Sequence, residues 1–142
     1  MGNTLVEDEI AAPISRVWAC FADFGDLGGW APGTPKVTLD GPPTAVGTVR
    51  LVEGEGQPPL RERLTAYDAD ARTFSYAMLE SPFPFTDYLA SVRLSDLGGG
   101  RTGIRWSSSF AEKGMPAERV TEMLENLYRM FIGKLKETLA GG

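Results

Sequence analysis

Polar and apolar residues alternate along much of this chain with the two-residue period of a β-strand. Residues 4–10 alternate in this way. Six further segments do so before the chain ends, and the turns between them are rich in Gly, Pro and Asp. These segments read KVTLDG, GTVRLVEG, LRERLTAYDA, RTFSYAMLE, DYLASVRLS and TGIRWSSSF. The pattern predicts seven strands, the last six joined mainly as hairpins.

Two segments have the longer period of a helix. Residues 12–24 carry Ile14, Val17, Trp18 and Phe21 on one stripe, and a second short helical turn ending near Trp30 is allowed by the sequence. The second segment, near the C-terminus, covers about 24 residues or roughly 36 Å, enough to cross a sheet. Its predicted apolar stripe consists of Val120, Met123, Leu124, Leu127, Phe131, Leu135 and Leu139.

The order of these elements predicts one α+β domain over residues 1–142. A strongly curved antiparallel sheet wrapped around the long C-terminal helix is the simplest way to bury both apolar surfaces. Gly133 interrupts the helix, either because a close neighbour needs the space or because a surface glycine is tolerated there.

Composition removes several classes of function. The chain has 142 residues, a net charge of −5, one cysteine and no histidine. Histidine-containing triads, Cys-His pairs and zinc sites with histidine ligands are therefore excluded, and we expect neither a metal nor a cofactor. Any proton transfer must use Asp, Glu, Tyr, Lys or water.

Charge and hydropathy also limit the partners and the location. Lys and Arg are scattered along the sequence, so nucleic acid is not an expected partner. The N-terminus is polar and acidic, and no apolar run of about 18 residues occurs, so we expect no transmembrane segment and a cytoplasmic protein. The oligomeric state stays open, a homodimer included.

One strand contains an unexpected acid. The segment LRERL places Leu60, Glu62 and Leu64 on one face and Arg61 and Arg63 on the other. Because strands of this kind normally turn the apolar face to the core, the acid lies on the side expected to be buried. A desolvated carboxylate without compensating partners can act as a general acid or base near neutral pH.

Several motifs carry a family resemblance that runs almost end to end. APISRVWACFADFGDLGGWAPG, the RERL run that starts at Arg61, TDY at residues 86–88 and RWSSSF resemble the START-like superfamily. That superfamily includes Bet v 1 allergens, plant abscisic acid receptors and bacterial polyketide cyclase/dehydrase proteins. The resemblance implies a helix-grip fold, a seven-stranded sheet around the C-terminal helix, with an apolar ligand cavity between them.

The resemblance and the strand parity together suggest the lining of that cavity. The loops at residues 53–59 and 80–85 match the two mobile loops at the cavity mouth of the abscisic acid receptors, with ordinary hairpin loops as the alternative. For each aromatic residue and methionine, plain core packing is the alternative. The candidate ligand-binding residues are Trp30, Arg50, Val52, Leu60, Leu64, Tyr76, Met78, Phe83, Phe85, Ala90, Trp106, Ser108, Phe110, Met115, Met123, Leu127 and Phe131.

Two functions follow as hypotheses. In the first, the cavity binds a polyketide-like or lipid-like molecule, and Glu62 with Tyr88 catalyses cyclisation or dehydration by acid–base chemistry. In the second, the protein is a non-catalytic carrier of a hydrophobic metabolite or lipid. Glu62 then only satisfies a buried charge, by pairing with Arg50 or a tyrosine. The parity of Arg50 leaves its direction open, and the absence of histidine weighs against the first hypothesis, because known cyclases of this superfamily use it.

Overall fold

The computed structural model describes residues 2–26, 30–31, 35–54, 56, 58–80 and 82–140. Within these residues the chain forms seven strands and two helices, in the order that the sequence predicts. The elements are β1 (Gly2–Ile10), α1 (Ile14–Phe21), β2 (Lys36–Asp40), β3 (Val49–Glu53), β4 (Leu60–Asp68), β5 (Thr73–Met78), β6 (Phe85–Gly98), β7 (Arg101–Glu112) and α2 (Ala117–Ala140).

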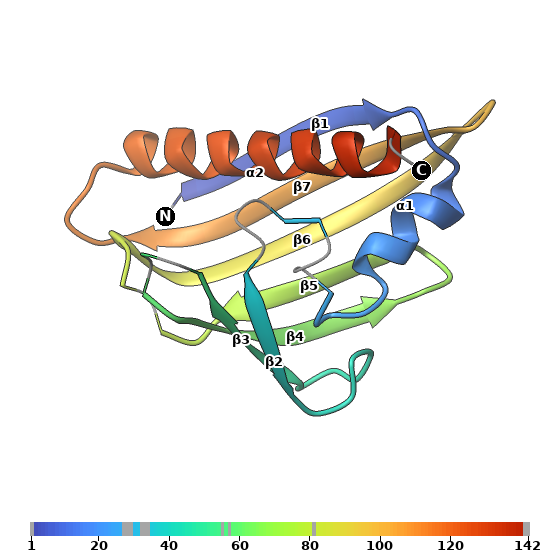
Figure 1. Ribbon diagram of the computed structural model, residues 1–142. Helices are drawn as coiled ribbons and strands as arrows, with labels where there is room; N and C mark the ends of the chain where they lie inside the picture. The colour runs from blue at the N-terminus through green and yellow to red at the C-terminus, as the bar shows by residue number, and fades with distance from the viewer. Residues whose placement is uncertain are drawn as a thin grey trace.

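The strands form one curved antiparallel sheet in the order β1-β7-β6-β5-β4-β3-β2. All neighbours except β1 and β7 are consecutive in the sequence. The long helix α2 lies along β1 and β7, and α1 closes one end of the sheet (Figure 1). This arrangement is the helix-grip fold, so the predicted fold class is confirmed.

Helix α1 is shorter than the sequence pattern suggests. It begins after Pro13 and ends at Phe21, with Val17, Trp18 and Phe21 buried. The Tyr67 hydroxyl donates a hydrogen bond of 2.9 Å to the Ala22 carbonyl, which satisfies one of the acceptors that the helix end exposes. The second short turn near Trp30 falls mainly on residues 27–29, which lie outside the described residues.

Helix α2 has the predicted length but buries a different stripe. The buried residues are Val120, Leu124, Tyr128, Ile132 and Leu135. Met123 and Leu127 are each 38% exposed, so the prediction that they belong to the buried stripe is wrong.

Contacts with the edge strand β1 explain this orientation of α2. Glu125 accepts a hydrogen bond from the Leu5 backbone N–H, and Thr121 donates to the Asn3 carbonyl. These contacts hold one flank of the helix on β1. Because α-helical residues advance by about 100° each, positions 123 and 127 lie on the opposite flank and turn away from the sheet.

A β-bulge in β6 re-aims two aromatic side chains. The β6–β7 register shifts between Thr86 and Leu89, and Asp87 has a φ of 53°. The extra residue reverses the inward–outward alternation, so Phe85 and Tyr88 both point to the core. Phe85 is 2% exposed and packs 6.1 Å from Phe110 between ring centroids. The predicted loop at residues 80–85 therefore ends before Phe85, which is the first residue of β6 and is buried.

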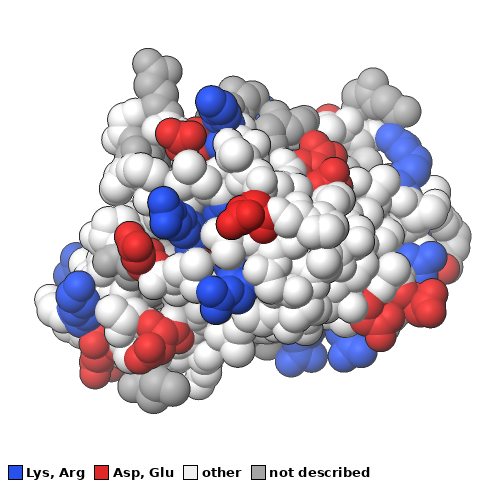
Figure 2. Space-filling model, turned by 90° about the horizontal axis from the view of Figure 1, so that it is seen from below, with Lys and Arg blue, Asp and Glu red and all other residues white. Residues whose placement is uncertain are grey.

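The glycine inside α2 has no close neighbour. No atom lies within 4 Å of a Cβ built on Gly133, so the surface alternative describes it. No helix in the described ranges is long and apolar enough to span a membrane. Figure 2 shows acidic and basic side chains interspersed over one face of the molecule around a broad uncharged area.

Candidate ligand-binding site

The inner face of the sheet brings the unexpected acid opposite a cation. Glu62 pairs with Arg50 in the β3–β4 register, and Leu60 pairs with Val52 two residues further along the strands. Directly opposed residues share a face of the sheet, so Arg50 points inward with Glu62. The register thus settles the direction of Arg50, which the parity of its own strand left open.

Arg50 and Glu62 form a buried ion pair. The Arg50 Nε donates to Glu62 Oε1 over 2.9 Å, and the two side chains are 7% and 10% exposed. Arg50 Nη1 also donates to the Phe24 carbonyl over 3.0 Å. The guanidinium lies 4.0 Å from the Phe24 ring centroid and 5.0 Å from that of Tyr76. The charge of the Glu62 carboxylate is therefore balanced by the Arg50 guanidinium. This is the arrangement of the second hypothesis, in which Glu62 only forms a buried ion pair.

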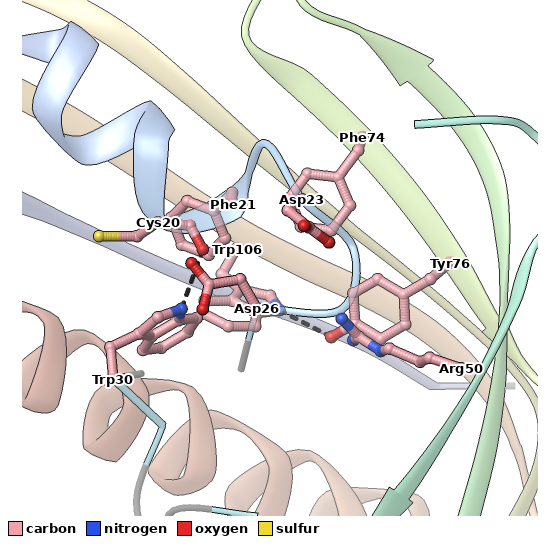
Figure 3. Close-up of a pocket in the computed structure, with 9 residues that line it drawn as sticks. All are labelled: Cys20, Phe21, Asp23, Asp26, Trp30, Arg50, Phe74, Tyr76 and Trp106. Carbon is pink, nitrogen blue, oxygen red and sulfur yellow. Dashed lines mark hydrogen bonds between the residues drawn. The ribbon is translucent and has the colours of Figure 1, made fainter. Parts of the chain in front are cut away.

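A small cavity lies beside this ion pair, between α1, the following loop and the sheet. Its volume is about 20 Å³, and its lining residues are Cys20, Phe21, Asp23, Asp26, Trp30, Arg50, Phe74, Tyr76 and Trp106. Figure 3 shows Arg50 next to Tyr76. Asp26 and Trp30 come from the segment between α1 and β2. A space of that size holds about one water molecule, whereas small-molecule sites usually measure ~300–1,000 Å³.

Aromatic rings form most of the wall. Trp106 stacks on Tyr128 at 5.2 Å and on Phe131 at 5.4 Å between ring centroids. Trp30 meets Phe131 edge-on at 5.9 Å, and its indole N–H donates to the Cys20 carbonyl over 2.9 Å. Rings in this arrangement offer large apolar faces to a flat or apolar guest.

The rim near α1 is acidic. Burial and the neighbouring charge of Asp23 raise the pKa of Asp26. Burial and the charge of Asp26 raise the pKa of the Cys20 thiol, which disfavours the reactive thiolate. Among the described residues, no group of three or more Cys, Asp or Glu is placed to hold a metal ion.

The interior also contains a set of linked hydroxyl groups. Tyr88 and Tyr128 hydrogen-bond through their phenols, and Tyr128 donates to Ser108 over 2.8 Å. Nearby, the Trp106 indole N–H donates to the Tyr76 hydroxyl over 3.3 Å. Burial is the largest cause that raises the pKa of Tyr76 and Tyr88 well above the ordinary value, so both phenols stay neutral.

The structure brings only part of the predicted site together. Trp30, Arg50, Tyr76 and Trp106 line the cavity, and Glu62 lies behind Arg50. The other predicted residues differ in burial. Those that are buried in the core are Leu64, Phe85, Tyr88, Ala90, Ser108 and Phe110. Those that are half-buried are Val52, Leu60, Met78, Phe83, Met115 and Phe131.

Several lining residues were missed by the sequence analysis. Asp23 and Asp26 come from the loop after α1, whose path no periodicity fixes. The same loop supplies Phe24, which contacts Arg50. Tyr128, which stacks on the lining residue Trp106, had a usable signal, because Leu124, Tyr128 and Ile132 repeat at four-residue spacing on one face of the helix.

Comparison with known proteins identifies the family of this chain. The sequence model of the family described as "Polyketide cyclase / dehydrase and lipid transport" matches residues 3–140. The chain belongs to this family. A search of the curated proteins finds no match to this chain.

Solved structures share the fold. A protein from Thermobifida fusca is 26% identical, with 96% of this chain and 92% of that chain covered and a TM-score of 0.87. The protein XoxI from Bacillus cereus is 22% identical, with coverages of 99% and 96% and a TM-score of 0.89. Norcoclaurine synthase from Thalictrum flavum, solved with dopamine and hydroxybenzaldehyde, is 18% identical, with coverages of 98% and 86% and a TM-score of 0.76. The family supports a role in binding hydrophobic ligands.

Proposed function

We propose that this family member binds a hydrophobic, polyketide-like or lipid-like small molecule in the cavity between α1, the loop that follows it and the inner face of the sheet. The observation that carries the proposal is the aromatic-walled cavity beside the buried Arg50–Glu62 pair. Flat apolar walls with few polar groups are the usual composition of small-molecule sites.

Ligand uptake requires the cavity to expand, because its present volume is only about 20 Å³. A closed apolar interior that opens for its guest keeps water away from the bound molecule. The apolar residues Met123 and Leu127 lie on an exposed flank of α2, and Met78 and Phe83 are half-buried on the sheet side. These adaptable side chains are candidates to contact ligand in the expanded state.

Catalysis is the more specific form of the proposal. In a cyclase, Glu62 and Tyr88 would move protons during aldol cyclisation or loss of water, with Arg50 released from Glu62 when the ligand binds. The ion pair favours the carrier alternative, because in the closed state Arg50 occupies the carboxylate that would otherwise act as the base.

Two measurements test the proposal. Native mass spectrometry of the purified protein should detect a co-purifying apolar molecule, or binding of an added neutral probe such as naphthol. A protein that carries no such molecule and binds no apolar probe would contradict the binding role.

The variant Glu62→Gln separates the two forms, since the amide still accepts from Arg50 but cannot take a proton. An enzyme loses turnover of a linear polyketone while it still binds that compound, whereas a carrier changes only in affinity. Glu9→Gln, on the exposed Arg101–Glu9 pair, is the matched control. If Glu62→Gln alters neither turnover nor binding, the site has been placed wrongly.

A further inference from the structure

The ring of Phe24 covers the polar end of the cavity wall. Its centroid lies 4.0 Å from the guanidinium carbon of Arg50 and 6.4 Å from the ring centroid of Tyr76, and both of these residues line the cavity. Phe24 is only 2% exposed, although it comes from the loop after α1. The phenyl ring therefore fills space on the inner face of the sheet, directly beside the enclosed volume.

The backbone of Phe24 is held in place on both sides, whereas its side chain can rotate. The Phe24 N–H donates to the Pro43 carbonyl over 3.1 Å, and the Phe24 carbonyl accepts from Arg50 Nη1 over 3.0 Å. Asp23 and Asp26 of the same loop are exposed, so the solvent-facing rim lies within two residues of the ring. Rotation about the Cα–Cβ bond can carry the ring to this rim while both backbone hydrogen bonds remain.

Arg50 has hydrogen-bond donors that the closed state does not use. A guanidinium carries five N–H groups. The Nε donates to Glu62 and Nη1 donates to the Phe24 carbonyl, and none of the described residues accepts a hydrogen bond from Nη2. The Arg50 side chain is 7% exposed and borders the cavity. A hydroxyl or carbonyl oxygen inside an enlarged cavity would therefore meet a buried donor.

We propose that Phe24 occupies the position of the ligand in the closed state, and that the ligand is a flat aromatic molecule with a hydroxyl or carbonyl oxygen. The ring of the ligand replaces the phenyl ring on the guanidinium, and its oxygen accepts a hydrogen bond from Arg50. Because a cation is attracted to the face of an aromatic ring, an aromatic guest keeps an interaction that a saturated chain loses.

This inference rests on the proposed function and narrows it. Of the polyketide-like and lipid-like molecules, it selects those with a flat aromatic ring over those with a plain acyl chain. It also explains how a cavity of about 20 Å³ accepts a larger guest, since the volume that the Phe24 ring leaves becomes part of the site.

Fluorine NMR tests the displacement of the ring in the folded protein. A fluorophenylalanine is introduced at position 24 alone, and the difference in its chemical shift between light and heavy water reports the exposure of the fluorine to solvent. Saturating naphthol should convert the signal at Phe24 from that of a buried ring to that of an exposed one. The matched control is the same label at Phe74, which is 5% exposed and lines the same cavity from β5. Its signal should remain that of a buried ring.

Two comparisons of affinity test the same proposal. Phe24→Ala removes the ring that the ligand must displace, so this variant should bind naphthol about tenfold more tightly than the wild type. Leu94→Ala, at a buried residue outside the cavity wall, controls for a loosened fold and should bind naphthol as the wild type does. Decahydronaphthol, the saturated counterpart of naphthol, should bind the wild type about fivefold more weakly than naphthol.

The possible results separate this inference from the proposed function. Naphthol that shifts the indole N–H signals of the lining residues Trp30 and Trp106 but leaves the label at Phe24 buried would overturn the inference and leave the binding role intact. Equal affinities for naphthol and decahydronaphthol would overturn the aromatic preference. Binding by Phe24→Ala alone would support the occupied site and contradict ligand uptake by the wild type. Binding by neither protein would contradict both proposals.

Discussion

The Arg50–Glu62 pair gives the sharpest test of the interior. Its side chains are 7% and 10% exposed, and the Arg50 guanidinium packs against the rings of Phe24 and Tyr76. Glu62→Leu leaves the guanidinium buried without its counter-ion, which costs ~3–5 kcal/mol when a buried pair is broken. Total stability of a small domain is only ~5–15 kcal/mol, so the loss should be large. At about 3 °C per kcal/mol, the midpoint of thermal unfolding should fall by roughly 10–15 °C.

A double-mutant cycle isolates the pair. Arg50→Met combined with Glu62→Leu replaces both charges by apolar groups, and the double variant should recover most of the stability lost in either single variant. Urea unfolding followed by tryptophan fluorescence gives the four free energies of unfolding. The control cycle uses the Arg101–Glu9 pair, whose side chains are 54% and 60% exposed and whose coupling should be at most ~1 kcal/mol. If the coupling at Arg50–Glu62 is as small as in the control, the ion pair is not buried as described.

Three further outcomes follow from particular positions. Gly133→Ala should raise the free energy of unfolding by up to ~1 kcal/mol, measured by urea unfolding, because no atom would meet the new methyl group; a loss of stability would contradict the exposed position. Leu127→Ala should lower the free energy of unfolding by less than ~1 kcal/mol and Leu124→Ala by ~2–5 kcal/mol, because only Leu124 is buried. The reverse order would show that α2 buries the flank that contains Leu127. The free energy of unfolding should also fall by about 1.4 kcal/mol per pH unit per tyrosine above pH ~10, where tyrosines of the unfolded chain ionise but buried ones stay protonated. The buried tyrosines are Tyr76, Tyr88 and Tyr128. Ultraviolet absorbance should show these three phenols ionising only as the protein unfolds, and ionisation of all four tyrosines of the chain near the ordinary pKa in the folded protein would refute the prediction.

Local periodicity accounts for the elements and for the inner face of each strand. The alternation around Glu62 placed Leu60, Glu62 and Leu64 on the buried side, and they lie there. The alternation within one strand does not predict the direction of a side chain where pairing with a neighbouring strand or an inserted residue determines it. The direction of Arg50 depends on the β3–β4 register, and that of Phe85 on the bulge at Asp87.

Tertiary contacts decide the rest of the site. The apolar arc of α2 is wider than the surface that the sheet covers, so hydrogen bonds to β1 determine which part is buried. The Phe24 carbonyl that binds Arg50 lies on the loop after α1, and the path of that loop has no signature in the sequence. The linked hydroxyls at Thr4, Ser108 and Tyr128 come from three separate elements, so only the assembled fold brings them together.

The central claim is that a hydrophobic molecule binds inside the aromatic-walled cavity. The chain has three tryptophans, which makes their indole N–H signals a simple reporter. Trp30 and Trp106 line the cavity, whereas Trp18 packs behind it on Tyr67 and Phe74. Titration with naphthol, followed by NMR, should shift the Trp30 and Trp106 signals in a saturable manner and leave that of Trp18 nearly unchanged. Saturable binding that leaves Trp30 and Trp106 unshifted, or no binding at all, would contradict the account.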